Sequence, residues 1–264
     1  MTLGARPYYV PVGKEEQVFR AAFRQGLSIL LKGPTGCGKT RFVEAMAFDL
    51  GRPLVTVACH DDLTTADLVG RFLLRGGETI WADGPLTRAV RDGAICYLDE
   101  IVEARQDTTV VLHPLADHRR QMPIDRLGTT LDAADGFGLV VSYNPGYQSV
   151  LKDLKDSTRQ RMVAIELDFP PADVEEKVVA HEADVEPEVA VQLVRLGQAI
   201  RRLETAGLRE VASTRVLVAA GRLVAYGLSL RDAARAAVAG PLTDDPLVTA
   251  GLFEMIDAYI SVRV

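Results

Sequence analysis

The sequence LSILLKGPTGCGKTRFVEAMAFDLG occupies residues 27–51 and decides the fold. Its first five residues, 27–31, form an apolar run that predicts a buried strand, and residues 39–50 have the pattern of a helix that Gly51 ends. Between them lies a glycine-rich loop of the form G-x-x-x-x-G-K-[ST], in the strand–loop–helix context that this motif requires. The loop consists of Gly33, Pro34, Thr35, Gly36, Cys37, Gly38, Lys39 and Thr40.

This loop has the chemistry of a nucleotide phosphate site. Its glycines let backbone N–H groups converge on phosphate oxygens, and the N-terminus of the following helix favours negative charge. Lys39 is placed to reach the outer phosphates of ATP, and Thr40 to offer its hydroxyl to Mg²⁺. A glycine-rich turn without a ligand is the alternative, which the flanking strand and helix disfavour.

A second apolar run, residues 94–98, ends in two carboxylates, Asp99 and Glu100. A buried strand that delivers two acids at its carboxyl end predicts a Walker B element beside the phosphate loop. Asp99 would hold Mg²⁺ through water, and Glu100 would polarise the water that attacks ATP. A solvated strand end with two acids is the competing interpretation.

Four further polar residues are candidates for the same reaction. Asn144 follows the apolar run 138–143 and is predicted to orient the attacking water. Arg159 and Arg161 precede the run 163–167, and either could be a finger that reaches the ATP of a neighbouring subunit. Arg215 begins a helix after Ser213-Thr214 and is predicted to reach the γ-phosphate. The alternatives are a turn asparagine and solvated arginines.

The order of the elements predicts an α/β protein with a second, helical part. Apolar runs at 27–31, 54–58, 94–98, 138–143 and 163–167 alternate with helical patterns, so we expect a five-stranded parallel sheet with helices on both faces. We expect this nucleotide-binding domain to span residues 1–170, with inserts near 70–83, a hairpin or a loop, and 117–136, a polar hairpin. Residues 171–264 predict a small all-helical lid, in which Gly240-Pro241 is expected to stop a helix.

Composition limits the classes of protein to which the chain can belong. The 264 residues carry a net charge of −6, and this acidic balance argues against broad nucleic-acid binding. The three cysteines, Cys37, Cys59 and Cys96, form no C-x-x-C pair, which favours a reducing, cytoplasmic compartment. No apolar run approaches the roughly 18 residues of a membrane span, so no membrane association is expected. A polar loop or a subunit contact is a better interpretation of His60-Asp61-Asp62 than a metal site.

With these residues assembled, the chain resembles the MoxR branch of AAA+ ATPases and, within it, the CbbQ/NorQ/NirQ group. The His-Asp-Asp segment and the segment after the fourth strand are more specific than the phosphate loop. The resemblance is carried by residues 31–42, 58–63, 83–89, 97–100 and 142–148.

The resemblance implies an ATP-hydrolysing ring hexamer, with ATP bound between subunits, and a partner that carries a von Willebrand factor A domain. In the CbbQ subgroup this partner is CbbO, and the complex is similar to a Rubisco activase that releases inhibitory sugar phosphates. In the NorQ and NirQ subgroups the complex helps to mature nitric oxide or nitrite reductase. Residues 79–81 and 149–155 are closer to CbbQ, so Rubisco is the expected client.

Two other classes compete with a remodelling ATPase. A small-molecule P-loop kinase would work as a monomer and would have no use for Asn144, the paired arginines or a helical C-terminal domain. A nucleotide-gated binding module with negligible hydrolysis would have less need of Glu100.

Overall fold

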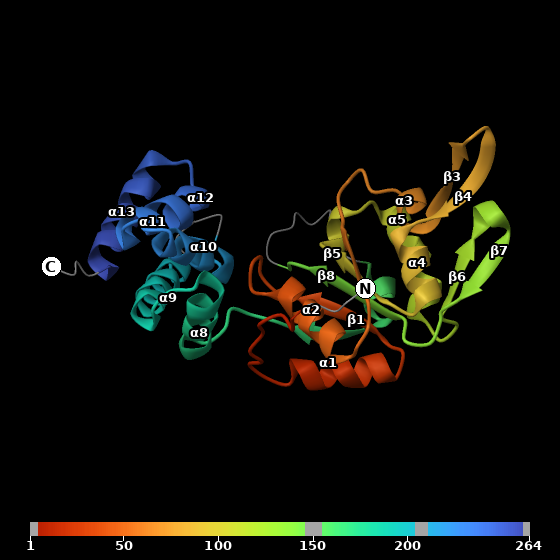
Figure 1. The fold of residues 1–264 in the computed structure, drawn as a ribbon, viewed down its shortest axis with the longest axis horizontal. Coiled ribbons are helices and arrows are strands. Elements are labelled where there is room, and N and C mark those ends of the chain that lie inside the picture. Colours follow the sequence, from red (N-terminus) through yellow and green to blue (C-terminus); the bar gives the residue numbers. More distant parts are fainter. Residues whose placement is uncertain (1–4, 146–154, 204–210, 261–264) are drawn as a thin grey trace. The chain divides into compact units, whose positions relative to one another are not determined.

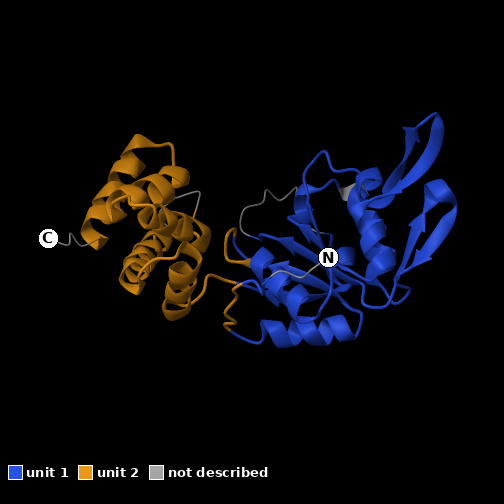
Figure 2. Cartoon of the chain, viewed as in Figure 1, with its two compact units in different colours: residues 1–7, 13–34, 39–167 blue, residues 8–12, 35–38, 168–264 orange. Residues whose placement is uncertain are grey.

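The structure is a computed structural model that describes residues 5–145, 155–203 and 211–260. The chain divides into two compact units (Figure 2). The first consists of Met1–Pro7, Gly13–Pro34 and Lys39–Leu167, and the second of Tyr8–Val12, Thr35–Gly38 and Asp168–Val264. Four of the eight residues of the phosphate loop, Thr35–Gly38, therefore belong to the second unit.

A five-stranded parallel sheet forms the centre of the first unit (Figure 1). The strand order is β2-β5-β8-β1-β9, and every neighbouring pair is parallel. The α/β fold with five parallel strands is therefore confirmed, with each strand within one residue of its predicted bounds. The strands are β1 (Ser28–Lys32), β2 (Leu54–Ala58), β5 (Ile95–Asp99), β8 (Gly138–Tyr143) and β9 (Met162–Glu166).

Helices cover both faces of this sheet. The central residues of β1, Ile29, Leu30 and Leu31, are each at most 1% exposed, as expected for a strand buried on both sides. On one face Phe19 of α1 and Phe42 of α2 pack edge to face, with ring centroids 5.5 Å apart. The helical segments are α1 (Glu15–Arg24), α2 (Lys39–Asp49), α3 (Thr65–Val69), α4 (Pro85–Asp92), η1 (Ile101–Glu103), α5 (Gln106–Thr109), η2 (Val110–Leu112), α6 (His113–Ala116) and α7 (Asp156–Arg159).

Both predicted inserts are antiparallel hairpins. The first joins β3 (Gly70–Arg75) to β4 (Glu78–Asp83), which settles the choice between a hairpin and a loop. Its two turn residues, Gly76 and Gly77, have φ of 62° and 88°, the left-handed backbone that a two-residue hairpin turn requires. The second insert joins β6 (Gln121–Ile124) to β7 (Thr129–Asp132) through η3 (Asp125–Leu127).

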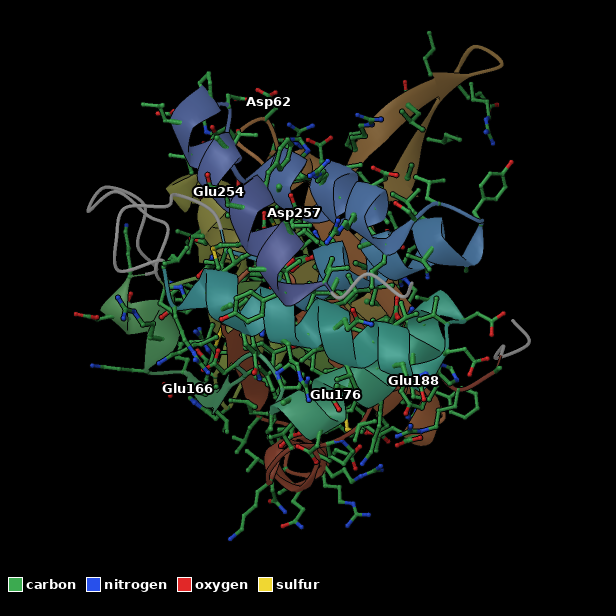
Figure 3. The ribbon with its side chains drawn as sticks, turned by 90° about the vertical axis from the view of Figure 1, so that its left-hand side faces the viewer. Asp62, Glu166, Glu176, Glu188, Glu254 and Asp257 are labelled. Carbon is green, nitrogen blue, oxygen red and sulfur yellow. The ribbon has the colours of Figure 1, made fainter. Side chains whose placement is uncertain are left out.

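The second unit contains helices and no strand among its described residues. Its amphipathic helices bury one apolar cluster, which includes Leu193, Leu217 and Ile256, while Glu188 and Glu254 are exposed (Figure 3). The predicted helical region is thus confirmed. Its segments are α8 (Ala172–Ala183), α9 (Pro187–Arg201), α10 (Thr214–Ala225), α11 (Leu230–Ala234), the π-helical η5 (Arg235–Ala239), α12 (Gly240–Leu242) and α13 (Pro246–Tyr259).

The expected helix stop at Gly240-Pro241 is wrong. Gly240 has helical φ and ψ of −56° and −45°, and the helix runs on to Leu242. A proline ring normally clashes with the carbonyl of the preceding helical turn. Here the π-helical segment Arg235–Ala239 comes directly before it, and its wider turn makes room for the ring.

No helix in the described parts of the chain is both long enough and apolar enough to cross a membrane.

Candidate functional site

The phosphate loop curls around its own lysine. Gly36 and Gly38 have φ of 75° and 103°, conformations that favour glycine. Lys39, only 7% exposed, begins α2, and its ammonium donates to the carbonyl oxygens of Gly33 and Pro34 at 2.8 and 2.9 Å. The positive charge is therefore held at the mouth of a loop whose shape suits phosphate.

The two acids lie at the carboxyl end of β5, next to the start of α2. Thr40 Oγ1 is 3.4 Å from Asp99 Oδ2, so the predicted pair of magnesium ligands is together. Asp99 is half-buried and Glu100 is exposed. Glu100 also has a left-handed backbone, with φ of 55° and ψ of 50°, which is uncommon for a residue other than glycine and often marks a functional position.

Asn144 lies at the same edge of the sheet. It follows Tyr143, the last residue of β8, which pairs with Lys32 at the end of β1. The carbonyl of Tyr143 also accepts the N–H of Gly33 at 3.4 Å. Parallel pairing therefore brings the predicted water-orienting amide to the first residue of the phosphate loop.

The two candidate finger arginines flank the end of α7. Arg159 is half-buried, with its Nε 3.9 Å from Asp156 Oδ1, and the exposed Arg161 donates to the carbonyl of Ser157. In the same segment Thr158 Oγ1 lies 2.8 Å from His113 Nε2, and the charge of Arg161 acts on that histidine, so these contacts do not single out either arginine as the finger. The structure therefore leaves the choice between the two arginines open.

Arg215 is exposed on the first turn of α10, in the second unit. The tip of the phosphate loop, Thr35–Gly38, belongs to this unit too. A Cβ on Gly36 would meet Ser213 Cβ at 2.6 Å and Arg215 Cβ at 3.4 Å. Any larger residue at position 36 would therefore collide with the start of α10.

Two buried hydroxyls that the sequence prediction missed complete the site. Tyr97 and Ser142, both 0% exposed, donate to Asp99 Oδ1 at 2.6 and 2.5 Å. A pattern signal existed, because Tyr97 lies two residues before Asp99 on the same face of β5 and Ser142 is a polar residue in a fully buried strand. Burial, with the bond to Asp99 next in weight, raises the pKa of Tyr97, so the phenol stays protonated.

Cys59 and Cys96, two cysteines near the site, are not nucleophiles. Burial, assisted by the charges of Asp99 and Glu100, raises the pKa of Cys59 to about 12. Burial likewise raises the pKa of Cys96 to about 12. Thiols with such pKa values remain protonated and unreactive at neutral pH.

Two segments singled out in the sequence add no described side chain to this site. His60, Asp61 and Asp62 are exposed in the turn after β2. Residues 146–154, which hold most of the segment compared with CbbQ, lie outside the described residues.

Comparisons with known proteins identify the class. A family described as "AAA domain (dynein-related subfamily)" matches residues 28–162. The RuvB Holliday junction branch migration motor of Thermotoga maritima shares the fold, with a TM-score of 0.54 and 17% identity over 91% of this chain and 66% of that one. The protein is an AAA+ ATPase, and its enzymatic activity is ATP hydrolysis.

The more particular family follows from the C-terminal unit and from close relatives. A family described as "CbbQ/NirQ/NorQ C-terminal" matches residues 175–259. The denitrification regulatory protein NirQ of Stutzerimonas stutzeri is 59% identical over 95% of this chain and 91% of its own length. NorQ of Paracoccus denitrificans is 59% identical over 96% and 93%, and CbbQ of Hydrogenophilus thermoluteolus is 55% identical over 92% and 91%. The chain belongs to the CbbQ/NirQ/NorQ family.

Proposed function

We propose that this ATPase uses Mg²⁺ and couples ATP hydrolysis to the remodelling of a protein client. The observation that carries the proposal is the meeting of the phosphate loop with the acids of β5, where Thr40 Oγ1 lies 3.4 Å from Asp99 Oδ2. A hydroxyl and a carboxylate are oxygen ligands of the kind that Mg²⁺ takes beside nucleotide phosphates. The donor set of the site therefore fits the ion.

Each residue has a proposed part in hydrolysis. Lys39 and the N–H groups of residues 33–40 bind the phosphates, and Thr40 and Asp99 hold Mg²⁺, Asp99 partly through water. When bound there, Mg²⁺ would supply positive charge against the negative charge of the phosphates. Glu100 accepts the proton of the attacking water, and Asn144 orients that water. The exposure of Glu100 at the strand end agrees with contact to a solvent nucleophile.

The proposed assembly is a hexamer with ATP between subunits. Residues 1–170 form the nucleotide-binding domain and 171–264 the lid, from which Arg215 contacts the γ-phosphate. Arg161 or Arg159, which flank the end of α7, acts on the ATP of the neighbouring subunit. Mixing Arg161→Ala with Lys39→Ala subunits tests this role, because mixed interfaces should regain hydrolysis. Verified mixed hexamers without any recovery would exclude Arg161 as the finger acting in trans.

For the client, we propose a denitrification enzyme, nitric oxide or nitrite reductase, reached through a partner with a von Willebrand factor A domain. Two kinds of relative at 59% identity carry the names NirQ and NorQ. Rubisco, with a CbbO-like partner, is the second candidate, favoured by the 55% identical CbbQ and by the Thr79-Ile80-Trp81 segment. Because the relatives named NirQ and NorQ are the more similar, the relatives do not specifically support Rubisco, the client expected from the sequence.

The experiment that separates the clients pairs the chain with each kind of partner. One arm measures nitric oxide and nitrite reduction by reductase produced with the chain and partner. The other measures carboxylation by Rubisco inhibited with sugar phosphates. Glu100→Gln is the matched control, because it keeps the fold and the phosphate loop. Gain of reductase activity that requires Glu100 supports the first client, whereas recovery of carboxylation alone would replace it with Rubisco.

A further inference from the structure

We infer that Ser142 is a positioning residue for ATP hydrolysis, which ties the magnesium ligand Asp99 to the water-activating Glu100 through one hydroxyl, with Tyr97 as its support. The inference rests on the proposed roles of Asp99 and Glu100. Its evidence is a set of hydrogen bonds between β5 and β8 that place a single buried oxygen between both acids.

Ser142 uses its one donor and one of its two acceptor positions in bonds to the two acidic residues. A serine hydroxyl has one proton to donate and two lone pairs to accept with. Ser142 Oγ donates to Asp99 Oδ1 at 2.5 Å and accepts the backbone N–H of Glu100 at 3.1 Å. Tyr97 Oη, which also donates to Asp99 Oδ1, lies 3.1 Å from Ser142 Oγ. The Ser142 hydroxyl therefore contacts Tyr97, Asp99 and the backbone of Glu100 at the end of β5.

These bonds fix how the Asp99 carboxylate is turned. Oδ1 receives two hydroxyl protons from the buried side, while Oδ2 is the oxygen near Thr40. Bonds to a carboxylate are shorter and stronger than bonds between neutral groups, so rotation of Asp99 would break two of them. The carboxylate is thereby held with one oxygen toward the proposed magnesium position. Partners that orient a metal ligand in this way usually matter for the metal's function.

The same hydroxyl steadies the backbone of Glu100. A left-handed conformation is unfavourable for a residue with a side chain, so it persists only where contacts impose it. The N–H of Glu100 is bonded to Ser142, and its carbonyl accepts the N–H of Glu103 at 2.9 Å. Loss of the Ser142 hydroxyl removes the first of these restraints, and the Glu100 carboxylate would then leave its position.

The position of Ser142 in the sheet explains why it can do this. The pairing of β5 with β8 reaches Leu98↔Val141, and the next step along both strands sets Asp99 beside Ser142. Asn144 follows two residues later on the same strand. The proposed metal ligand Asp99, the water-activating Glu100 and the water-orienting Asn144 thus all lie at the carboxyl ends of the paired strands β5 and β8.

The test compares Ser142→Ala with Tyr97→Phe, each of which removes one oxygen, and with Thr87→Val. Thr87 is a matched control, because its buried hydroxyl donates to Val69 O at 2.5 Å away from the acids. There are two readouts. The first is ATP turnover measured together with ATP affinity, and the second is hydrogen exchange of the Glu100 amide in nucleotide-free protein. The second readout does not depend on the loaded enzyme.

We expect Ser142→Ala to lose about 10–100-fold in kcat at unchanged ATP affinity, the usual range for partners of metal ligands, and to exchange the Glu100 amide faster. Tyr97→Phe should lower kcat less and leave that amide protected, and Thr87→Val should change neither. Wild-type kcat and exchange in Ser142→Ala would overturn the inference, as would a Tyr97→Phe variant that matches wild type if Ser142→Ala fails to fold. Glu100→Gln separates the two claims, because normal hydrolysis by that variant would refute the proposed function itself.

Discussion

Replacing Arg201 by methionine should lower the free energy of unfolding of the helical unit far more than replacing a surface residue would. Glu175 on α8 is fully buried and accepts the Arg201 guanidinium on both oxygens, at 2.8 and 2.6 Å. Arg201 also donates to the carbonyl of Ala212 at 2.7 Å and stacks over Phe169 at 4.1 Å. This ion pair therefore joins α8, α9 and the start of α10.

The expected loss of free energy of unfolding follows from the buried Glu175 carboxylate, which remains in the variant without its partner. Methionine keeps much of the apolar stem of arginine, so the change is mainly electrostatic. Glu175 keeps the Thr214 hydroxyl at 2.5 Å but loses its countercharge. Breaking a buried pair from one side costs about 3–5 kcal/mol, and replacing both partners by apolar residues is often neutral. Arg201→Met should fall in that range, and adding Glu175→Leu should restore most of the loss.

The assay is hydrogen exchange of the α9 amides, because a chain of two units has no single unfolding transition. The control is Arg222→Met, which removes a 62% exposed arginine 3.5 Å from the partly buried Glu182 and should cost no more than about 1 kcal/mol. A loss in Arg201→Met as small as the control's would refute the reasoning. A double variant as unstable as Arg201→Met would refute it too.

Two further predictions concern single groups. Burial, and then the charges of Arg161 and Lys155, lower the pKa of His113 against the opposing charge of Asp117, so the unfolded chain binds this proton first. The free energy of unfolding of the first unit should therefore fall as pH drops below the ordinary histidine value of 6.5. That of His113→Gln, followed by hydrogen exchange in the sheet of the first unit between about pH 7.5 and 5.5, should fall less, and equal slopes would contradict this. Asp245 caps α13 by accepting the N–H of Leu247 at 2.8 Å, so Asp245→Ala should cost about 1 kcal/mol and speed exchange in the first turn. Asp244→Ala is the control, and an equal loss of stability in that variant would refute a stabilising N-cap at Asp245.

The sheet could be predicted from sequence because each strand is a short apolar run between polar turns. The small errors are at strand ends, where burial rather than pattern decides. Leu27 is 50% exposed and lies outside β1, whereas the polar Lys32 pairs with Tyr143 and Glu166 within the sheet. The helix through Gly240 could not be predicted, because a π-helical turn before a proline has no sequence signature.

The candidate site divides in the same way. The phosphate loop and the two acids could be predicted because the residues of each motif are adjacent in the sequence. For Ser142 and Tyr97 the pattern marks only their places on buried strands, because their role depends on a bond between residues that are 45 apart in sequence. Glu175 was missed for a related reason: only the packing of three helices shows that this helical acid is buried.

The central claim is that Glu100 activates water for ATP hydrolysis at a site built by Lys39, Thr40 and Asp99. The most direct measurement is ATP turnover by Glu100→Gln beside its affinity for ATP with Mg²⁺. The account predicts that the variant binds ATP as the wild type does while turnover falls by about 10²–10⁴-fold, the usual contribution of a general base. Turnover at the wild-type rate would contradict it.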